Sequence, residues 1–314
     1  MAKPRRAKAV AAATSSGWSS WIAMRLLGTI YRPAVLLPLA LIGAGLVLTP
    51  YLSAWIPSLN GRPEYVTSVE AIRISPPNRW VPDDFVERTV RTAGYTTELS
   101  LLDEKLVHRL GQAFAADPWV KELQRIRMHR DGRIEVELTY RHPVLMVQAG
   151  TGTYAVDVDG VLLPPGDFSP EETVQFPLAV NARSLPQGAA GRAWGDPAIV
   201  GAAQLASILA PEQDLSRHWT PLHLRAIHIP TPTTATRDLK SIDYELLTTG
   251  GSRILWGRVP GADDLEPPAS TKLQKLEFYL SQYGQYEQPN GVCQIDVRPF
   301  DVVSSRPLDA SRMR

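Results

Sequence analysis

The chain has 314 residues, of which 44% are hydrophobic and 21% are charged, a composition that excludes a wholly disordered protein. Residues 1–32 contain six of the 33 basic residues and no acidic residue, so the other 282 residues carry 27 basic and 32 acidic groups, a net charge of −5. A body of that charge argues against nucleic-acid binding, and a single cysteine, Cys293, excludes intramolecular disulfides and multi-cysteine metal sites.

The segment from Pro33 to Ile56 is almost entirely apolar, and no charged residue occurs between Pro33 and Gly61. As a helix this segment would span about 36 Å, which is enough for a hydrocarbon core of about 30 Å. It starts too far from the N-terminus and runs too long for a typical cleaved signal peptide. Residues 33–56 are therefore predicted to form a transmembrane signal anchor, with a cleaved signal or a buried hairpin as alternatives. The basic residues before it predict a cytoplasmic leader over residues 1–32 and an exported body.

The first expected domain of the body begins with a strand and two helices. A strand is expected over Tyr65–Ile74, and Pro82 is well placed to open a helix that Gly94 ends. A second helix follows and stops at Asp117–Pro118. Its apolar residues recur at every fourth position and form one stripe: Leu102, Leu106, Leu110 and Phe114.

Two further strands complete this domain. Alternating apolar and polar residues predict strands over 124–129 and 134–140, and Asp131–Gly132 between them is a strong hairpin signal. The expected order is strand, helix, helix, strand, strand.

The rest of the body is expected to be mostly strand. Asp196 can cap a helix that Pro211 stops. A second helix is expected after the proline-rich stretch 266–268, with apolar residues at helical spacing: Leu273, Leu276, Leu280 and Tyr283. Residues 305–314 are expected to form a disordered tail. Strands are predicted over residues 146–149, 154–158, 224–229, 242–248, 253–258 and 292–298. The predicted fold class is α+β, with a single transmembrane helix followed by two exported domains.

Four sequence words in this order carry a resemblance to a known family. They are DPWV at 117–120, ELTYRHP at 137–143, YAVDVDGV at 154–161, and Lys272 followed by IDVR at 295–298. Behind a predicted signal anchor, they resemble the bacterial cell-division proteins FtsQ and DivIB. The resemblance implies a POTRA domain (β-α-α-β-β) over residues 64–143 and an FtsQ-type mixed β domain with flanking helices over 144–304.

The chain departs from the family's pattern at two places. The family usually carries a Glu-Arg pair shortly before a proline. At that place this sequence reads Tyr140–Arg141–His142–Pro143. Family members often have an aromatic residue directly after the IDVR word, whereas here Pro299 precedes Phe300. Because proline removes a backbone donor, any strand-pairing surface after IDVR departs from the family's pattern.

No motif in the body predicts catalysis or a cofactor. His223 and His228 are five residues apart, which matches neither a helical nor a strand pair of metal ligands. Asp157 and Asp159 resemble a carboxylate pair for acid–base catalysis, but the turn at Gly160 is a sufficient reason for both residues. The body is therefore predicted to be non-enzymatic, with no cofactor and no metal.

Without a catalytic constellation, binding is the expected function. The strand Cys293–Arg298 is expected at a sheet edge, where free N–H and C=O groups can accept a partner strand. The resemblance implies that this region binds FtsB-like and FtsL-like single-span division proteins, and that the POTRA domain recruits other division proteins. The predicted partner-binding residues are Ile295, Asp296, Val297, Arg298 and Phe300.

The resemblance thus predicts a scaffold of the division machinery, anchored in the inner membrane with its N-terminus in the cytoplasm and its body outside it. Such a scaffold would recruit and regulate septal peptidoglycan synthesis proteins at the division septum. Two alternatives remain: a POTRA-containing envelope scaffold for polypeptide assembly or secretion, and a signal-anchored envelope enzyme.

Overall fold

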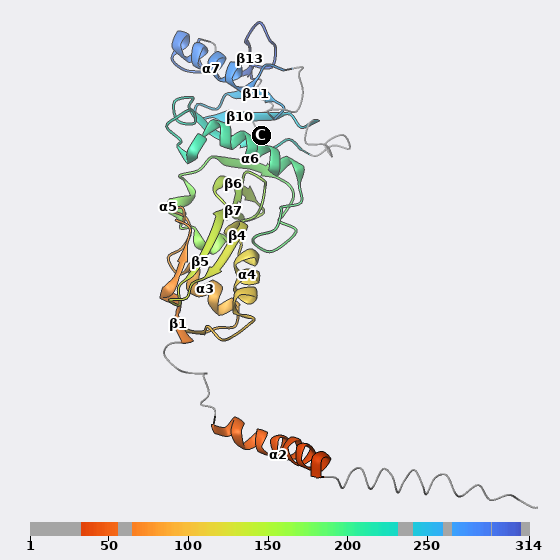
Figure 1. Ribbon diagram of the computed structural model, residues 1–314. Coiled ribbons are helices and arrows are strands. Elements are labelled where there is room, and N and C mark those ends of the chain that lie inside the picture. Colours follow the sequence, from red (N-terminus) through yellow and green to blue (C-terminus); the bar gives the residue numbers. More distant parts are fainter. Residues whose placement is uncertain (1–32, 56–64, 232–240, 260–265, 290, 309–314) are drawn as a thin grey trace, which may run out of the picture. The chain divides into compact units, whose positions relative to one another are not determined.

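The computed structural model describes residues 33–55, 65–231, 241–259, 266–289 and 291–308 (Figure 1). The chain divides into two compact units, Met1–Gly61 and Arg62–Arg314. The predicted leader, residues 1–32, lies outside the described residues.

The described part of the first unit is one helix, α2 (Pro33–Trp55). A membrane span needs about 20 consecutive apolar residues. Within the part of the chain that the structure describes, none of the helices combines the length and the apolar character that a membrane crossing requires. The transmembrane helix predicted over residues 33–56 is therefore not shown, and that part of the predicted fold class is wrong.

The second unit is α+β and contains a large sheet. Its first part holds a three-stranded sheet in the order β2-β5-β4 and a two-stranded sheet, β1-β3. Two helices accompany these strands: α3 (Phe85–Thr92) and α4 (Leu106–Ala116). The strands are β1 (Val66–Ser68), β2 (Ile72–Ile74), β3 (Glu98–Ser100), β4 (Val120–Met128) and β5 (Ile134–Tyr140).

Local sequence signals explain most of these elements. Gly94 and Gly132 have φ values of +85° and +82°, which β-carbon-bearing residues rarely adopt, and they end α3 and close the β4–β5 hairpin. The strand expected over 65–74 is interrupted by a 3-10 turn, Val69–Ala71, so that β1 and β2 join different sheets. Strand β3 was not predicted, because three residues give no readable alternation.

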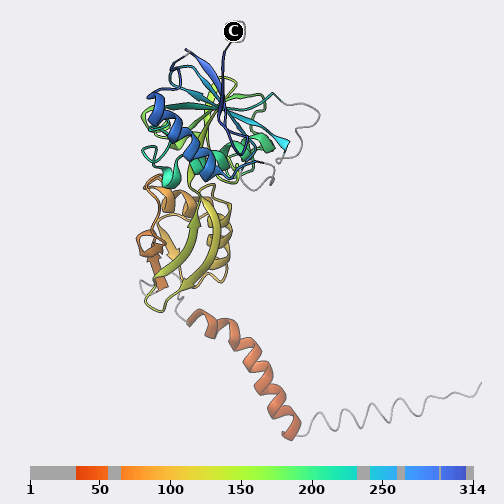
Figure 2. The same ribbon diagram turned by 90° about the horizontal axis from the view of Figure 1, so that it is seen from above.

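The large sheet has eight strands in the order β13-β12-β11-β10-β9-β8-β6-β7. In Figures 1 and 2 the later part of the chain, coloured green to blue, lies beyond the orange and yellow first part of the second unit. Helix α6 (Pro197–Leu209) connects the parallel strands β8 and β9, and α7 (Ala269–Tyr283) connects the parallel strands β11 and β12. The strands are β6 (Pro143–Ala149), β7 (Gly152–Asp157), β8 (Leu178–Ala182), β9 (Leu224–His228), β10 (Tyr244–Thr248), β11 (Arg253–Gly257), β12 (Cys293–Asp296) and β13 (Ser304–Pro307).

The predicted start and end of a helix in this part are confirmed at α6. The Asp196 carboxylate accepts a hydrogen bond from the N–H of Ala198 (2.9 Å), and the helix ends at Leu209 before Pro211. Two strands were missed, β8 and β13. The tail predicted to be disordered from residue 305 is instead strand over Ser304–Pro307; its remainder, 309–314, lies outside the described residues.

Two apolar cores hold the second unit together. One packs α6 and α7 against the large sheet. The other lies under the three-stranded sheet and also takes in side chains from residues 146–176, so it joins the first part to the large sheet. The joining residues are Met146, Ala155, Leu163 and Phe176.

Candidate partner-binding site

Strand β12, which was expected at the sheet edge, lies inside the sheet. It pairs in parallel with β11 on one side and antiparallel with β13 on the other. The predicted edge position of Cys293–Arg298 is therefore wrong. The chain itself covers that edge with β13, which becomes the terminal strand at this end of the sheet.

Strand β13 presents main-chain groups to solvent. All four of its residues are exposed. The N–H of Leu308 donates to the carbonyl of Val292 (3.0 Å), and antiparallel pairing alternates inward-facing and outward-facing residues. The main chain of Ser305 and Pro307 therefore faces away from β12. Pro307 has no N–H to offer, so the outward donor of this strand belongs to Ser305.

The opposite edge of the sheet, β7, is less open. The N–H of Asp157 donates to the carbonyl of Val161 (3.1 Å), and that of Leu163 donates to the carbonyl of Ala155 (2.9 Å). The segment that follows β7 thus occupies some of the outward-facing main-chain groups of β7. Of the two ends of the sheet, β13 is the more accessible to an incoming strand.

Helix α7 lies beside the β13 edge because buried residues hold it on the sheet. Leu273, Leu276 and Tyr279 are buried in the core. The Lys272 ammonium is also buried and donates to the carbonyl of Trp256 (2.7 Å) and to the Glu266 carboxylate (2.6 Å). Burial lowers the pKa of Lys272, and its hydrogen bond with Glu266 acts in the opposite direction. Lys272, the lysine of the fourth sequence word, thus anchors α7.

A groove of about 460 Å³ lies between α7 and the segment that leads into β13. Such a volume lies within the range of typical ligand sites. Its lining residues are Thr271, Gln274, Lys275, Phe278, Tyr279, Gln282, Tyr283, Asp301, Val302, Val303 and Ser305.

Large apolar side chains stand exposed in and beside this groove. Phe278 is 62% exposed, Val302 65% and Tyr283 45%, and Phe300 next to the groove is 56% exposed. Exposed apolar groups gathered at one place are typical of interaction surfaces. The Lys275 ammonium donates to the carbonyl of Pro299 and fixes α7 to the segment that carries Phe300.

The predicted partner-binding residues do not form one surface. Ile295 and Val297 are fully buried in the core of the large sheet. Asp296 and Arg298 are partly buried and bind each other, whereas Phe300 is exposed at the groove's margin. Of the five, Phe300 alone presents a large apolar side chain to solvent.

The Asp296–Arg298 pair shapes the turn between β12 and β13. The guanidinium of Arg298 donates to both carboxylate oxygens of Asp296 (2.9 and 2.7 Å), and the N–H of Arg298 donates to the same carboxylate (3.0 Å). The hydrogen bond from Arg298 lowers the pKa of Asp296. This pair orders the chain just before the groove segment.

Few patterns in the sequence indicated the residues that form this groove. Ser304–Pro307 shows no apolar alternation, so nothing marked it as a strand. Phe278 stands off the apolar stripe of its helix, and a large aromatic residue in that position was the one available signal of an exposed apolar surface.

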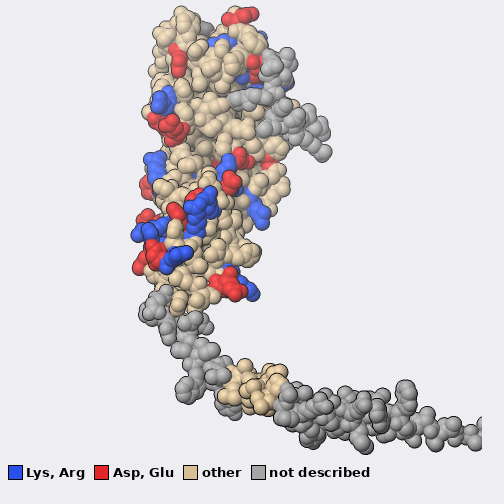
Figure 3. Space-filling view, viewed as in Figure 1, with Lys and Arg blue, Asp and Glu red and all other residues tan. Residues whose placement is uncertain are grey.

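The lining of the groove combines apolar side chains with polar groups that can bind a partner. Within the described residues, no group of three or more histidine, cysteine or acidic side chains could hold a metal ion. On the face drawn in Figure 3, basic and acidic side chains are intermixed and form no broad basic patch. Main-chain groups of an edge strand beside exposed apolar side chains fit an extended polypeptide.

No model of a known protein family matches the chain, and no curated protein matches it.

Proposed function

We propose that the protein is a non-enzymatic scaffold that binds a partner polypeptide as an added strand on β13. The observation that carries this proposal is the open edge of β13 beside the aromatic groove of α7. An extended segment paired with Ser305 would lie next to Phe278, Tyr283 and Val302. Main-chain hydrogen bonds would supply part of the affinity, and the apolar contacts would supply specificity.

The resemblance of the four sequence words to FtsQ and DivIB supports a place for this scaffold in cell division. On that basis the partners are the extracytoplasmic segments of FtsB-like and FtsL-like division proteins, and the scaffold acts at the division septum. It would recruit and regulate the proteins that synthesise septal peptidoglycan.

The experiment is a rescue of depleted cells with full-length chains expressed at the native level as fluorescent fusions. Depletion of the untagged protein should block septation, and the wild-type fusion should restore it and collect at the division plane. Ser305→Pro removes the outward N–H of β13. This variant should reach the division plane at a level similar to that of the wild-type fusion, but it should not restore septation. Ser305→Ala keeps that N–H and should restore it fully.

The experiment tests the role in division and strand addition on β13 separately. Normal septation after depletion would overturn the role in division, and the partner would then be sought in polypeptide assembly or secretion. Full rescue by Ser305→Pro would overturn strand addition on β13.

A further inference from the structure

Helix α7 has the groove beside β13 on one flank and a loop on the other. Three of the groove-lining residues, Gln274, Phe278 and Gln282, follow one another at helical spacing along one side of α7. Glu277 projects from the other flank, toward the loop 210–223 that connects α6 to β9. Its carboxylate lies 3.7 Å from Nδ1 of His218 in that loop. A movement of α7 that widens the groove therefore brings Glu277 closer to His218.

Two buried polar atoms in the neighbourhood of Glu277 have no hydrogen-bond partner among the described residues. Nδ1 of His218 is buried, and 3.7 Å is too long for a hydrogen bond to Glu277. The hydroxyl of Tyr286 is also unpartnered, in a side chain that is 1% exposed. Burial raises the pKa of Tyr286, and the nearby charges of Glu287 and Glu277 add to the rise. Because an unpartnered buried polar atom costs free energy, a closer approach of Glu277 would remove part of this cost.

The loop that carries His218 has an unusual main-chain conformation. Glu212, Gln213 and His223 have φ values of +56°, +63° and +49°, which residues with a β-carbon rarely adopt. Such residues persist only where their surroundings hold them, and they cluster in ligand clamps and switch regions. The buried Trp219 holds the middle of the loop in the core of the large sheet. The ends of the loop are thus the strained parts.

The start of the loop is fixed to the first part of the second unit. The indole N–H of Trp80 donates to the side-chain oxygen of Gln213 (2.7 Å), and the amide nitrogen of Gln213 lies 3.4 Å from Nδ1 of His142. Trp80 is 7% exposed and belongs to the core under the three-stranded sheet. The loop therefore extends from that core to the flank of α7.

We infer that the loop 210–223 is a latch that closes on α7 when a partner strand enters the groove beside β13. The strand widens the groove and moves the later turns of α7 toward the loop, while the buried Lys272 keeps the start of the helix in place. An N–H at Nδ1 of His218 then donates to the Glu277 carboxylate. Because this hydrogen bond forms only in the bound state, it raises the affinity for the partner. The inference rests on the proposed strand addition at β13 and makes His218 a positioning residue for that site.

The test is fluorescence anisotropy of the purified full chain with a labelled, uncharged eight-residue peptide of alternating leucine and threonine. The same peptide with N-methyl groups in place of its main-chain N–H groups should not bind. His218→Leu and Glu277→Met should each weaken binding about 5-fold, the effect of one hydrogen bond to a charged group. The double variant should bind no more weakly than either single variant, because all three lose the same contact. His218→Asn keeps a side-chain N–H donor and should restore most of the affinity.

Stability without peptide separates a latch from a merely structural contact. Glu277 is 56% exposed and makes no hydrogen bond to His218 in the free chain. Urea unfolding of Glu277→Met without peptide should therefore have the same midpoint as that of wild type. A loss of stability equivalent to the loss of affinity would show that the pair already acts in the free chain and would overturn the latch.

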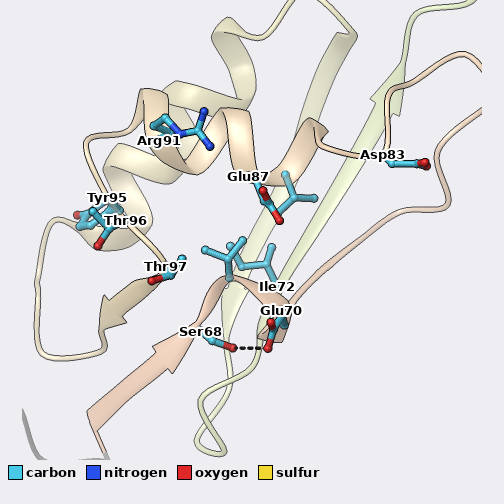
Figure 4. Close-up of a pocket in the computed structure, with 11 residues that line it drawn as sticks. Ser68, Glu70, Ile72, Asp83, Glu87, Arg91, Tyr95, Thr96 and Thr97 are labelled. Carbon is cyan, nitrogen blue, oxygen red and sulfur yellow. Dashed lines mark hydrogen bonds between the residues drawn. The ribbon is translucent and has the colours of Figure 1, made fainter.

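A control variant shows whether the peptide lies at another groove. A groove of about 550 Å³ between α3 and the segment from β1 to β2 carries Glu70 and Glu87 on either side of Ile72 (Figure 4). These residues take no part in the latch, so Glu70→Gln/Glu87→Gln should bind the peptide like wild type. Weaker binding by this variant would place the peptide away from β13 and would overturn the inference.

Failure of the latch and failure of strand addition give different results. Unchanged affinity of His218→Leu and Glu277→Met, or additive losses in the double variant, would overturn the latch and leave strand addition on β13 in place. Absence of binding by the wild type, or equal binding by Ser305→Pro, would overturn strand addition on β13 and the latch with it.

Discussion

Asp157 shows how one buried carboxylate serves both a turn and a charge pair. One of its oxygens accepts hydrogen bonds from the N–H groups of Asp159 (3.0 Å) and Val161 (2.8 Å), which explains its place before Gly160. The other oxygen accepts a bond from the Arg141 guanidinium (2.7 Å). The Asp157 side chain is 3% exposed and that of Arg141 is 15% exposed. Arg141 thus has a buried structural partner in Asp157.

Asp157→Ala should lower the free energy of unfolding by about 3 kcal/mol, because it leaves the Arg141 charge buried without its partner. Asp159→Ala is the matched control two residues away. Asp159 binds Lys121 (2.7 Å) with a side chain that is 52% exposed, so its loss should cost less than about 1 kcal/mol. Urea unfolding of the full chain measures both values, and equal costs would contradict a special role for the buried pair.

At the scale of elements, the β12–β13 connection depends on the Asp296–Arg298 pair. The hydrogen bond from Arg298 lowers the pKa of Asp296 below that of an unfolded aspartate, about 3.9. Around that pH the unfolded chain therefore binds more protons at this position than the folded chain does. The stabilisation is complete above about pH 5 and is lost as the pH falls through the lowered pKa.

Asp296→Asn should therefore lower the free energy of unfolding by an amount that depends on pH. The difference in unfolding free energy between wild type and this variant should be constant above about pH 5 and should shrink toward pH 2. Arg298→Met should abolish the same pH dependence, because it removes the cause of the lowered pKa. Unfolding of the full chain at a series of pH values measures the effect, and a deficit that grows with acid would refute it.

At the scale of the whole second unit, Asp167 joins the two parts. Its carboxylate accepts two hydrogen bonds from Arg88 (3.1 and 3.3 Å) and one from the indole N–H of Trp119 (2.8 Å). Around it, Phe168 contacts the rings of Trp80 and Trp119. Because these contacts sit on a shared apolar core, the two parts are expected to unfold together.

Asp167→Ala should lower the unfolding free energy by about 2 kcal/mol, since it leaves Trp119 and Arg88 without their shared acceptor. Asp84→Ala removes a second carboxylate near Arg88 (3.3 Å), whose side chain is 58% exposed, and should cost about 0.5 kcal/mol or less. Tryptophan fluorescence during urea unfolding checks both. Two separate transitions in the wild type would show that the two parts are not joined as described.

Patterns that depend on neighbours in the chain were readable without the structure. The alternation of Ile134, Val136, Leu138 and Tyr140 placed β5 and its buried face correctly. The stripe of Leu106, Leu110 and Phe114 likewise marked the buried side of α4, and Asp196 marked the start of α6. These features follow from helix and strand periodicity and from capping, which are local properties.

Features set by distant contacts were not readable. The sequence by itself determined that 292–298 contains a strand, but only the tertiary structure decided that β12 lies inside the sheet, because the β13 segment that covers it carries no pattern of its own. In the same way, Ile295 and Val297 were assigned to a partner and belong to the core. The accessible groove beside α7 arises because residues of α7 and of 301–305, far apart in the chain, meet at the edge that β13 leaves open.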